Sequence, residues 1–140
     1  MFLSAQRGAT AYATLGVETG VVSANPHELV LMLFDGAGAA VSGALHHMGR
    51  SDLEKKGSSI SKAVMIIESG LRASLNREAG GPIAQRLDAL YAYMSNRLVL
   101  GSMRNQPEPL EEVLGLLGEL REAWASIDKI SPPAELCSIP

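Results

Sequence analysis

The three histidines are the first residues to consider for chemistry, because helical proteins can hold a pair of metal ions through Glu-x-x-His motifs on facing helices. None of the three has a glutamate three residues before it. His46 and His47 are adjacent, and adjacent side chains on a helix point about 100° apart, which makes them a poor pair of ligands for one metal ion. The sequence therefore predicts neither a metal site nor a resident cofactor.

Catalytic nucleophiles and bases give no better candidates. The single cysteine, Cys137, rules out an internal disulfide and fits a reducing compartment, and it lies in a proline-flanked tail with no element to position a thiolate. No H-E-x-x-H motif, Walker loop or nucleophile elbow is present. Asp35 is the one carboxylate in a long apolar stretch. It is either a general base or, in the interpretation we favour, the partner of a lysine or arginine. We expect no enzyme.

The composition favours packed helices. The chain has 140 residues, the size of one domain, with 46% hydrophobic residues, 19% charged residues and a mean hydropathy of +0.11. Only two Phe, one Trp and three Tyr are present, so aliphatic side chains must build the core, whereas β-sandwiches use many aromatic and branched residues. The net charge of −3, without a basic cluster, argues against nucleic-acid binding.

Helix start signals occur twice in the first half of the chain. Residues 25–28 (NPHE) offer an asparagine cap, a proline in the first turn and a glutamate that closes a capping box, which predicts a helix to about Arg50. Residues 51–54 (SDLE) form a second capping box and predict a helix to about Glu78. Apolar residues recur at steps of three, four or seven in this second helix, as expected for one buried face.

Glycine and proline divide the second half of the chain. Residues 80–82 (GGP) end the second helix and start a third, and residues 106–109 (QPEP) separate the third helix from a fourth that ends at Pro132. Short breaks make neighbouring helices antiparallel. We therefore expect an all-α protein, an antiparallel up-down-up-down four-helix bundle with an N-terminal lid segment. Its expected parts are the lid segment at 1–24, the bundle at 25–130 and a flexible C-terminal tail at 131–140.

The first helix is more apolar than a bundle requires. Leu29 to Gly49 contains one formal charge and could span a bilayer by length, but small and polar residues interrupt it and it lacks aromatic or basic flanks. The N-terminal residues also lack the pattern of a secretory signal. We therefore expect no membrane insertion. Residues 29–34 (LVLMLF) surround the whole helix, so their outer face either packs under the N-terminal segment or accepts an apolar partner helix.

Several ordered motifs resemble the FliS family of flagellin export chaperones. Residues 25–36 (NPHELVLMLFDG) are similar to the family's motif at the start of the first bundle helix. Further matches in the expected order are Lys62-Ala63 with Ile66-Ile67, GGPIA at 80–84, LDALYAYM at 87–94 and LREAW at 120–124. Upstream, Tyr12, Val17 and Thr19 stand where family members carry Tyr, Val and Thr. The resemblance covers about residues 10–127.

The resemblance implies a cytosolic, ATP-independent chaperone that binds the disordered C-terminal segment of flagellin. Such binding would prevent premature polymerisation and keep flagellin competent for flagellar type III secretion, with the export gate as a second partner. The resemblance places Tyr12 and Val17 in a lid over part of the groove, and it places Leu29, Met32 and Leu33 among the partner-binding residues.

Two other functions remain open at this point. The chain could be a general helical adaptor or a homodimer that uses the same apolar face, and weak self-association is compatible with either function. An enzyme with a metal or small molecule in the bundle core is the weaker alternative, because the ligand motif is missing. The apolar run does not by itself separate residues that face the core from residues that face flagellin.

Overall fold

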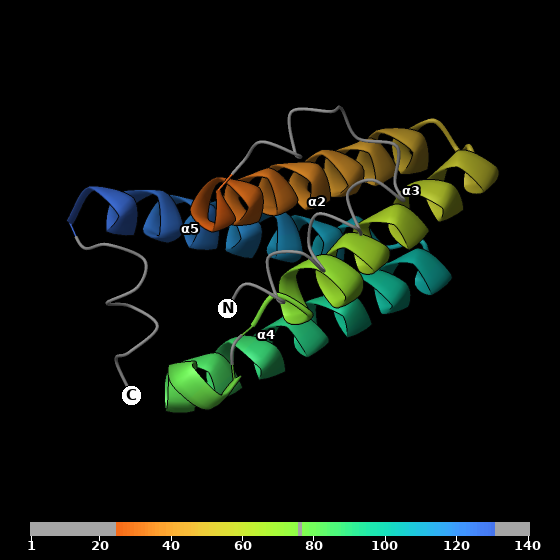
Figure 1. Cartoon of the computed structure of the whole chain (residues 1–140). Helices are drawn as coiled ribbons and strands as arrows, with labels where there is room; N and C mark the ends of the chain where they lie inside the picture. Colours follow the sequence, from red (N-terminus) through yellow and green to blue (C-terminus); the bar gives the residue numbers. More distant parts are fainter. Residues whose placement is uncertain (1–24, 76, 131–140) are drawn as a thin grey trace.

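The computed structural model describes residues 25–75 and 77–130, except for the side chains of 77–79 and 128–130. The described residues contain helices and no strand (Figure 1). The elements are α2 (Pro26–Gly49), α3 (Leu53–Met65), the π-helix η2 (Ile66–Arg72), α4 (Arg77–Arg104) and α5 (Pro107–Ile130). The predicted all-α class with four long helices is confirmed. The proposed lid at 1–24, with Tyr12 and Val17, and the proposed tail at 131–140 lie outside the described residues.

The predicted cap of α2 is confirmed in detail. The backbone N–H of Glu28 donates to Asn25 Oδ1 at 2.8 Å, and Asn25 Nδ2 donates to Glu28 Oε1 at 3.1 Å. The cap of the next helix is Asp52, one residue later than the predicted cap, Ser51. Ser51 adopts a positive φ of 57° in the turn, and Asp52 is the cap, accepting from the backbone N–H of Lys55 at 3.1 Å.

The second predicted helix ends earlier than expected. Its α-helical part stops at Met65, and a π-helix continues to Arg72 instead of an α-helix to about Glu78. Two features favour the end of helical structure after Arg72 and not at Glu78: Gly70 has a low helix propensity, and the Ser74 hydroxyl donates to the Gly70 carbonyl oxygen at 2.6 Å.

Of the two later boundaries, the predicted break at Gly81-Pro82 is confirmed, and the last helix begins earlier than predicted. The span of α4 contains Gly81 at φ 54° and ψ −132°, so its regular helix starts at Pro82, while a short helical turn precedes the kink. The last helix includes Pro107 in its first turn, where a missing N–H costs nothing, and therefore starts before the predicted break ends.

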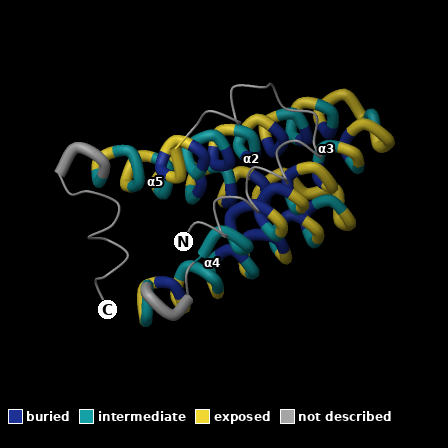
Figure 2. Tube along the Cα trace, viewed as in Figure 1, coloured by how far each residue is buried: buried dark blue, intermediate teal, exposed yellow. Residues whose placement is uncertain are grey.

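The core lies where α2 meets the other helices. α2 packs against α3 and α5, and α4 packs against α5, α3 and η2 (Figure 1). Figure 2 shows the buried stretches of these helices turned toward the middle of the bundle. The largest fully buried side chains are Leu33, Val41, Ile66, Ile67, Leu71, Met94, Leu98, Leu110, Val113 and Leu117.

The helix α2 is the one helix in the described part of the chain that is long and apolar enough to cross a membrane. In the structure, however, nine of its 24 residues are buried inside the protein. Its packing against α3 and α5 supports its interpretation as a core helix. The absence of membrane insertion remains a prediction.

Candidate partner-binding site

The apolar run at the start of α2 divides into two groups. Leu29, Leu33 and Phe34 are buried in the core, with Leu33 fully inaccessible. Val30, Leu31 and Met32 are half-buried, and Val30 and Met32 pack at the margin of that core. Of the predicted partner-binding residues in the described part, Met32 is therefore partly accessible, whereas Leu29 and Leu33 belong to the core in this conformation. Contact of these residues with a partner remains a prediction.

The helix α5 fixes the first turn of α2. Trp124 Nε1 donates to the His27 carbonyl oxygen at 3.0 Å, and the two rings stack with centroids 5.2 Å apart. His27 is buried, and neither of its ring nitrogens has a hydrogen-bond partner. The His27 and Trp124 rings therefore join the two helices through apolar contact, while the indole N–H supplies the polar link.

Asp35 lies at the other end of the apolar run and has the partner that the sequence predicted. Arg121 Nε donates to Asp35 Oδ1 at 2.8 Å, with a second, longer contact of 3.5 Å. The hydrogen bond with Asp35 raises the pKa of Arg121 above its ordinary value. An ion pair between α2 and α5 accounts for this carboxylate, so a role as general base is not needed to explain it.

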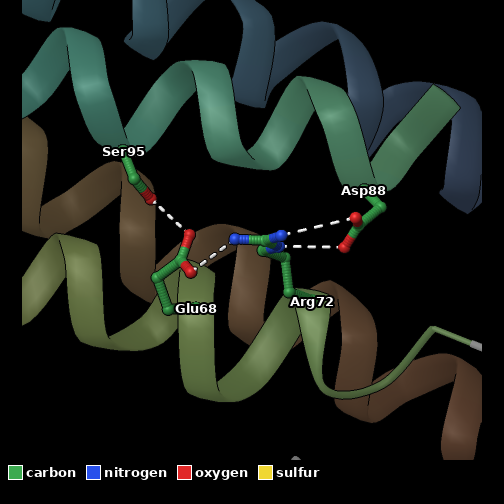
Figure 3. Close-up of polar contacts among 4 residues, drawn as sticks. All are labelled: Glu68, Arg72, Asp88 and Ser95. Atoms are coloured by element: carbon green, nitrogen blue, oxygen red, sulfur yellow. Dashed lines mark hydrogen bonds and ion pairs between the residues drawn. The ribbon is translucent and has the colours of Figure 1, made fainter. Parts of the chain in front are cut away.

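A polar network joins η2 to α4 (Figure 3). Arg72 donates to Asp88 through Nε at 2.9 Å and to Glu68 at 2.7 Å, and the Ser95 hydroxyl donates to Glu68 at 2.8 Å. The hydrogen bonds with Asp88 and then Glu68 raise the pKa of Arg72, which keeps the guanidinium charged. The spacing of Glu68 and Arg72 is compatible with an ion pair within one helix, but the link to α4 could not be predicted, because the members of the network are spread over 28 positions on two elements.

Large apolar side chains are also exposed away from α2. Those on α3 are Leu53 (62% exposed) and Met65, and those on α4 include Val99 and Met103 (79% exposed). Helical periodicity could not single these residues out, because an exposed leucine or methionine has the same sequence signal as one at the margin of the core. They add apolar surface outside the α2 motif.

A second polar contact links α4 and α5 on the surface. The Tyr93 hydroxyl donates to Glu112 at 2.6 Å, and Arg97 donates to the same carboxylate at 2.8 Å. The hydrogen bond from Tyr93, and then the one from Arg97, lower the pKa of Glu112, and the bond to Glu112 raises the pKa of Tyr93.

In residues 25–75 and 77–130, no group of three or more His, Cys, Asp or Glu side chains is arranged to hold a metal ion.

Comparison with known proteins decides the family. The sequence model described as "Flagellar protein FliS" matches residues 8–131. The chain belongs to the FliS family. The flagellar secretion chaperone FliS of Salmonella typhimurium (strain LT2) is 46% identical over 127 residues, which cover 91% of this chain and 92% of the relative. FliS of Escherichia coli K12 is 44% identical, covering 86% of this chain and 88% of that protein.

A third FliS relative extends the similarity to another organism. The flagellar secretion chaperone FliSB of Pseudomonas aeruginosa is 40% identical over 116 residues, which cover 83% of this chain and 91% of the relative. FliS proteins are chaperones of flagellar secretion and not enzymes. The family match includes the motif at the start of α2 and every described helix.

Proposed function

We propose that this FliS-family chain is a cytosolic export chaperone that binds the disordered C-terminal segment of flagellin. Binding would prevent premature polymerisation and keep flagellin competent for flagellar type III secretion, and the flagellar export gate would receive the complex. Membership of the family of flagellar secretion chaperones is the observation that carries this proposal. No nucleotide is required, because burial of the segment's apolar face on the chaperone drives binding.

The physical basis of the proposal is apolar surface beyond what the core uses. Val30 and Met32 remain half-buried beside a fully formed core, and α3 and α4 expose Leu53, Val99 and Met103. A disordered amphipathic segment can fold as it covers such surface, at the cost of its ordering entropy. Tyr12 and Val17 are proposed as lid residues that cover part of this surface in the free chaperone.

Sedimentation velocity with and without a peptide of the flagellin C-terminal segment tests the proposal. We expect a monomer that forms a one-to-one complex with the peptide. A scrambled peptide of the same composition serves as the control for unspecific apolar adhesion. A stable dimer that ignores the peptide would contradict the proposal and favour the helical adaptor instead.

A further inference from the structure

The segment Ile66–Arg72 has an unusual backbone. It forms a π-helix of seven residues that continues α3, and a turn follows it at residues 73 and 74. π-helices are rare, they occur mostly as single turns within α-helices, and they are frequent at functional sites. No regular helix directly continues this segment at its C-terminal end.

The π-helix η2 lies directly over Leu33 of the family motif. A Cβ atom at Gly70 would lie 2.8 Å from Leu33 Cδ2, so only glycine permits this approach without movement of the leucine. Leu33 is fully buried. The motif residue that the family resemblance assigns to partner binding is therefore covered by the one π-helix in the described part of the chain.

A charged clamp holds η2 in place. We define the Arg72 clamp as Glu68, Arg72, Asp88 and Ser95, the four residues of Figure 3. Arg72 bridges Glu68 within η2 and Asp88 on α4, and Ser95 on α4 holds the second oxygen of Glu68. The Arg72 and Asp88 side chains are only 28% and 26% exposed, so water screens their ion pair less than a surface pair.

We propose that η2 is a switch segment, held over Leu33 by the Arg72 clamp, and that its opening gives the chaperone's partner access to Leu33. The proposal rests on the function proposed above. Ile66, Ile67 and Leu71 are buried in the closed state, which therefore dominates in the free protein. When a partner binds only the open state, its apparent affinity falls in proportion to the open fraction. A weaker clamp should then expose η2 and also speed binding.

Hydrogen exchange in the free protein tests the first half of the proposal. Arg72→Met keeps the aliphatic bulk and removes the clamp, and Arg121→Met removes the ion pair with Asp35 as a matched control. In Arg72→Met we expect amides of 66–72 to exchange about tenfold faster, which corresponds to a loss of about 1.4 kcal/mol. The control should leave these amides unchanged. Equal exchange of 66–72 in the two variants would overturn the proposal.

Binding kinetics test the second half. For a peptide of the flagellin C-terminal segment, Arg72→Met should associate several-fold faster than the wild type, and Arg121→Met should not. Glu68→Gln is the second variant if Arg72→Met fails to fold, with the same expected direction. Unchanged or slower association would overturn the switch while wild-type binding still supports the proposed function. No binding by the wild type would overturn the proposed function. The hydrogen-exchange result would then still decide whether the Arg72 clamp holds η2 closed.

Discussion

Trp124 on α5 donates a hydrogen bond of 3.0 Å to the carbonyl oxygen of His27, and its indole ring stacks on the His27 ring with the planes 15° apart. These two contacts hold the first turn of α2 against the C-terminal half of α5. Because the family motif begins at this turn, the position of the apolar run depends on a residue nearly a hundred positions away in the chain.

Trp124→Phe should lower the free energy of unfolding by about 1 kcal/mol, because phenylalanine keeps an aromatic ring over His27 but cannot donate the hydrogen bond. Trp124→Ala should cost more, since the stacking is lost as well. Urea unfolding followed by circular dichroism measures both values. A Trp124→Phe variant as stable as the wild type would contradict the prediction, because it would show that this hydrogen bond adds no net stability.

Exposed glycines in helices offer a prediction of increased stability. A Cβ at Gly115 or Gly118 on α5 meets nothing within 4 Å, so alanine at either position should stabilise the protein by about 0.5–1 kcal/mol. Gly101 is the control, because its Cβ would lie 2.6 Å from Leu110 and 3.1 Å from the Gln106 carbonyl oxygen. Gly101→Ala should destabilise. Thermal unfolding should therefore give a higher midpoint for the first two variants and a lower one for Gly101→Ala. A Gly101→Ala variant as stable as the other two would contradict the prediction.

Alkaline pH should destabilise the fold through Tyr91. Burial raises the pKa of this phenol above its ordinary value of 10.0, so the unfolded chain ionises first. The stabilising contribution is complete below pH 10 and falls as pH rises further, by up to about 1.4 kcal/mol per pH unit. Tyr91→Phe should reduce this slope. Denaturant unfolding between pH 9 and 11 measures it, and parallel curves for the two proteins would contradict the prediction.

Met32 and Leu33 are adjacent but should respond differently to substitution. Met32 is half-buried, so Met32→Gln should weaken binding of the flagellin peptide about tenfold with little loss of stability. Leu33 is fully buried, so Leu33→Ala should destabilise the free protein by about 3 kcal/mol. Calorimetric titration and urea unfolding separate the two effects. Unchanged affinity in Met32→Gln would remove this residue from the proposed interface.

Much of the fold could be predicted from local signals. Short-range stereochemistry predicts the Asn25 cap and the break at Gly81-Pro82, and the structure has both. The cost of leaving a charge unpaired predicts a basic partner for Asp35, which is Arg121. The π-helix could not be predicted, because residues 66–72 have an ordinary helical apolar pattern and their register depends on tertiary packing against Leu33.

The candidate site was predicted less completely than the fold. Six consecutive apolar residues at 29–34 indicate surplus surface but do not say which side chains the neighbouring helices cover. Only packing showed that Leu29 and Leu33 face inward while Met32 stays at the margin. The exposed Leu53 and Met103 were missed for the same reason, because exposure is decided by distant parts of the chain.

Filament growth by flagellin in the presence of this protein tests the central claim most directly. Purified monomeric flagellin is induced to polymerise with and without an equimolar amount of the full chain, and light scattering follows the growth of filaments. We predict that filaments fail to grow while a one-to-one complex accumulates. Polymerisation at the same rate and to the same extent in both samples would contradict it.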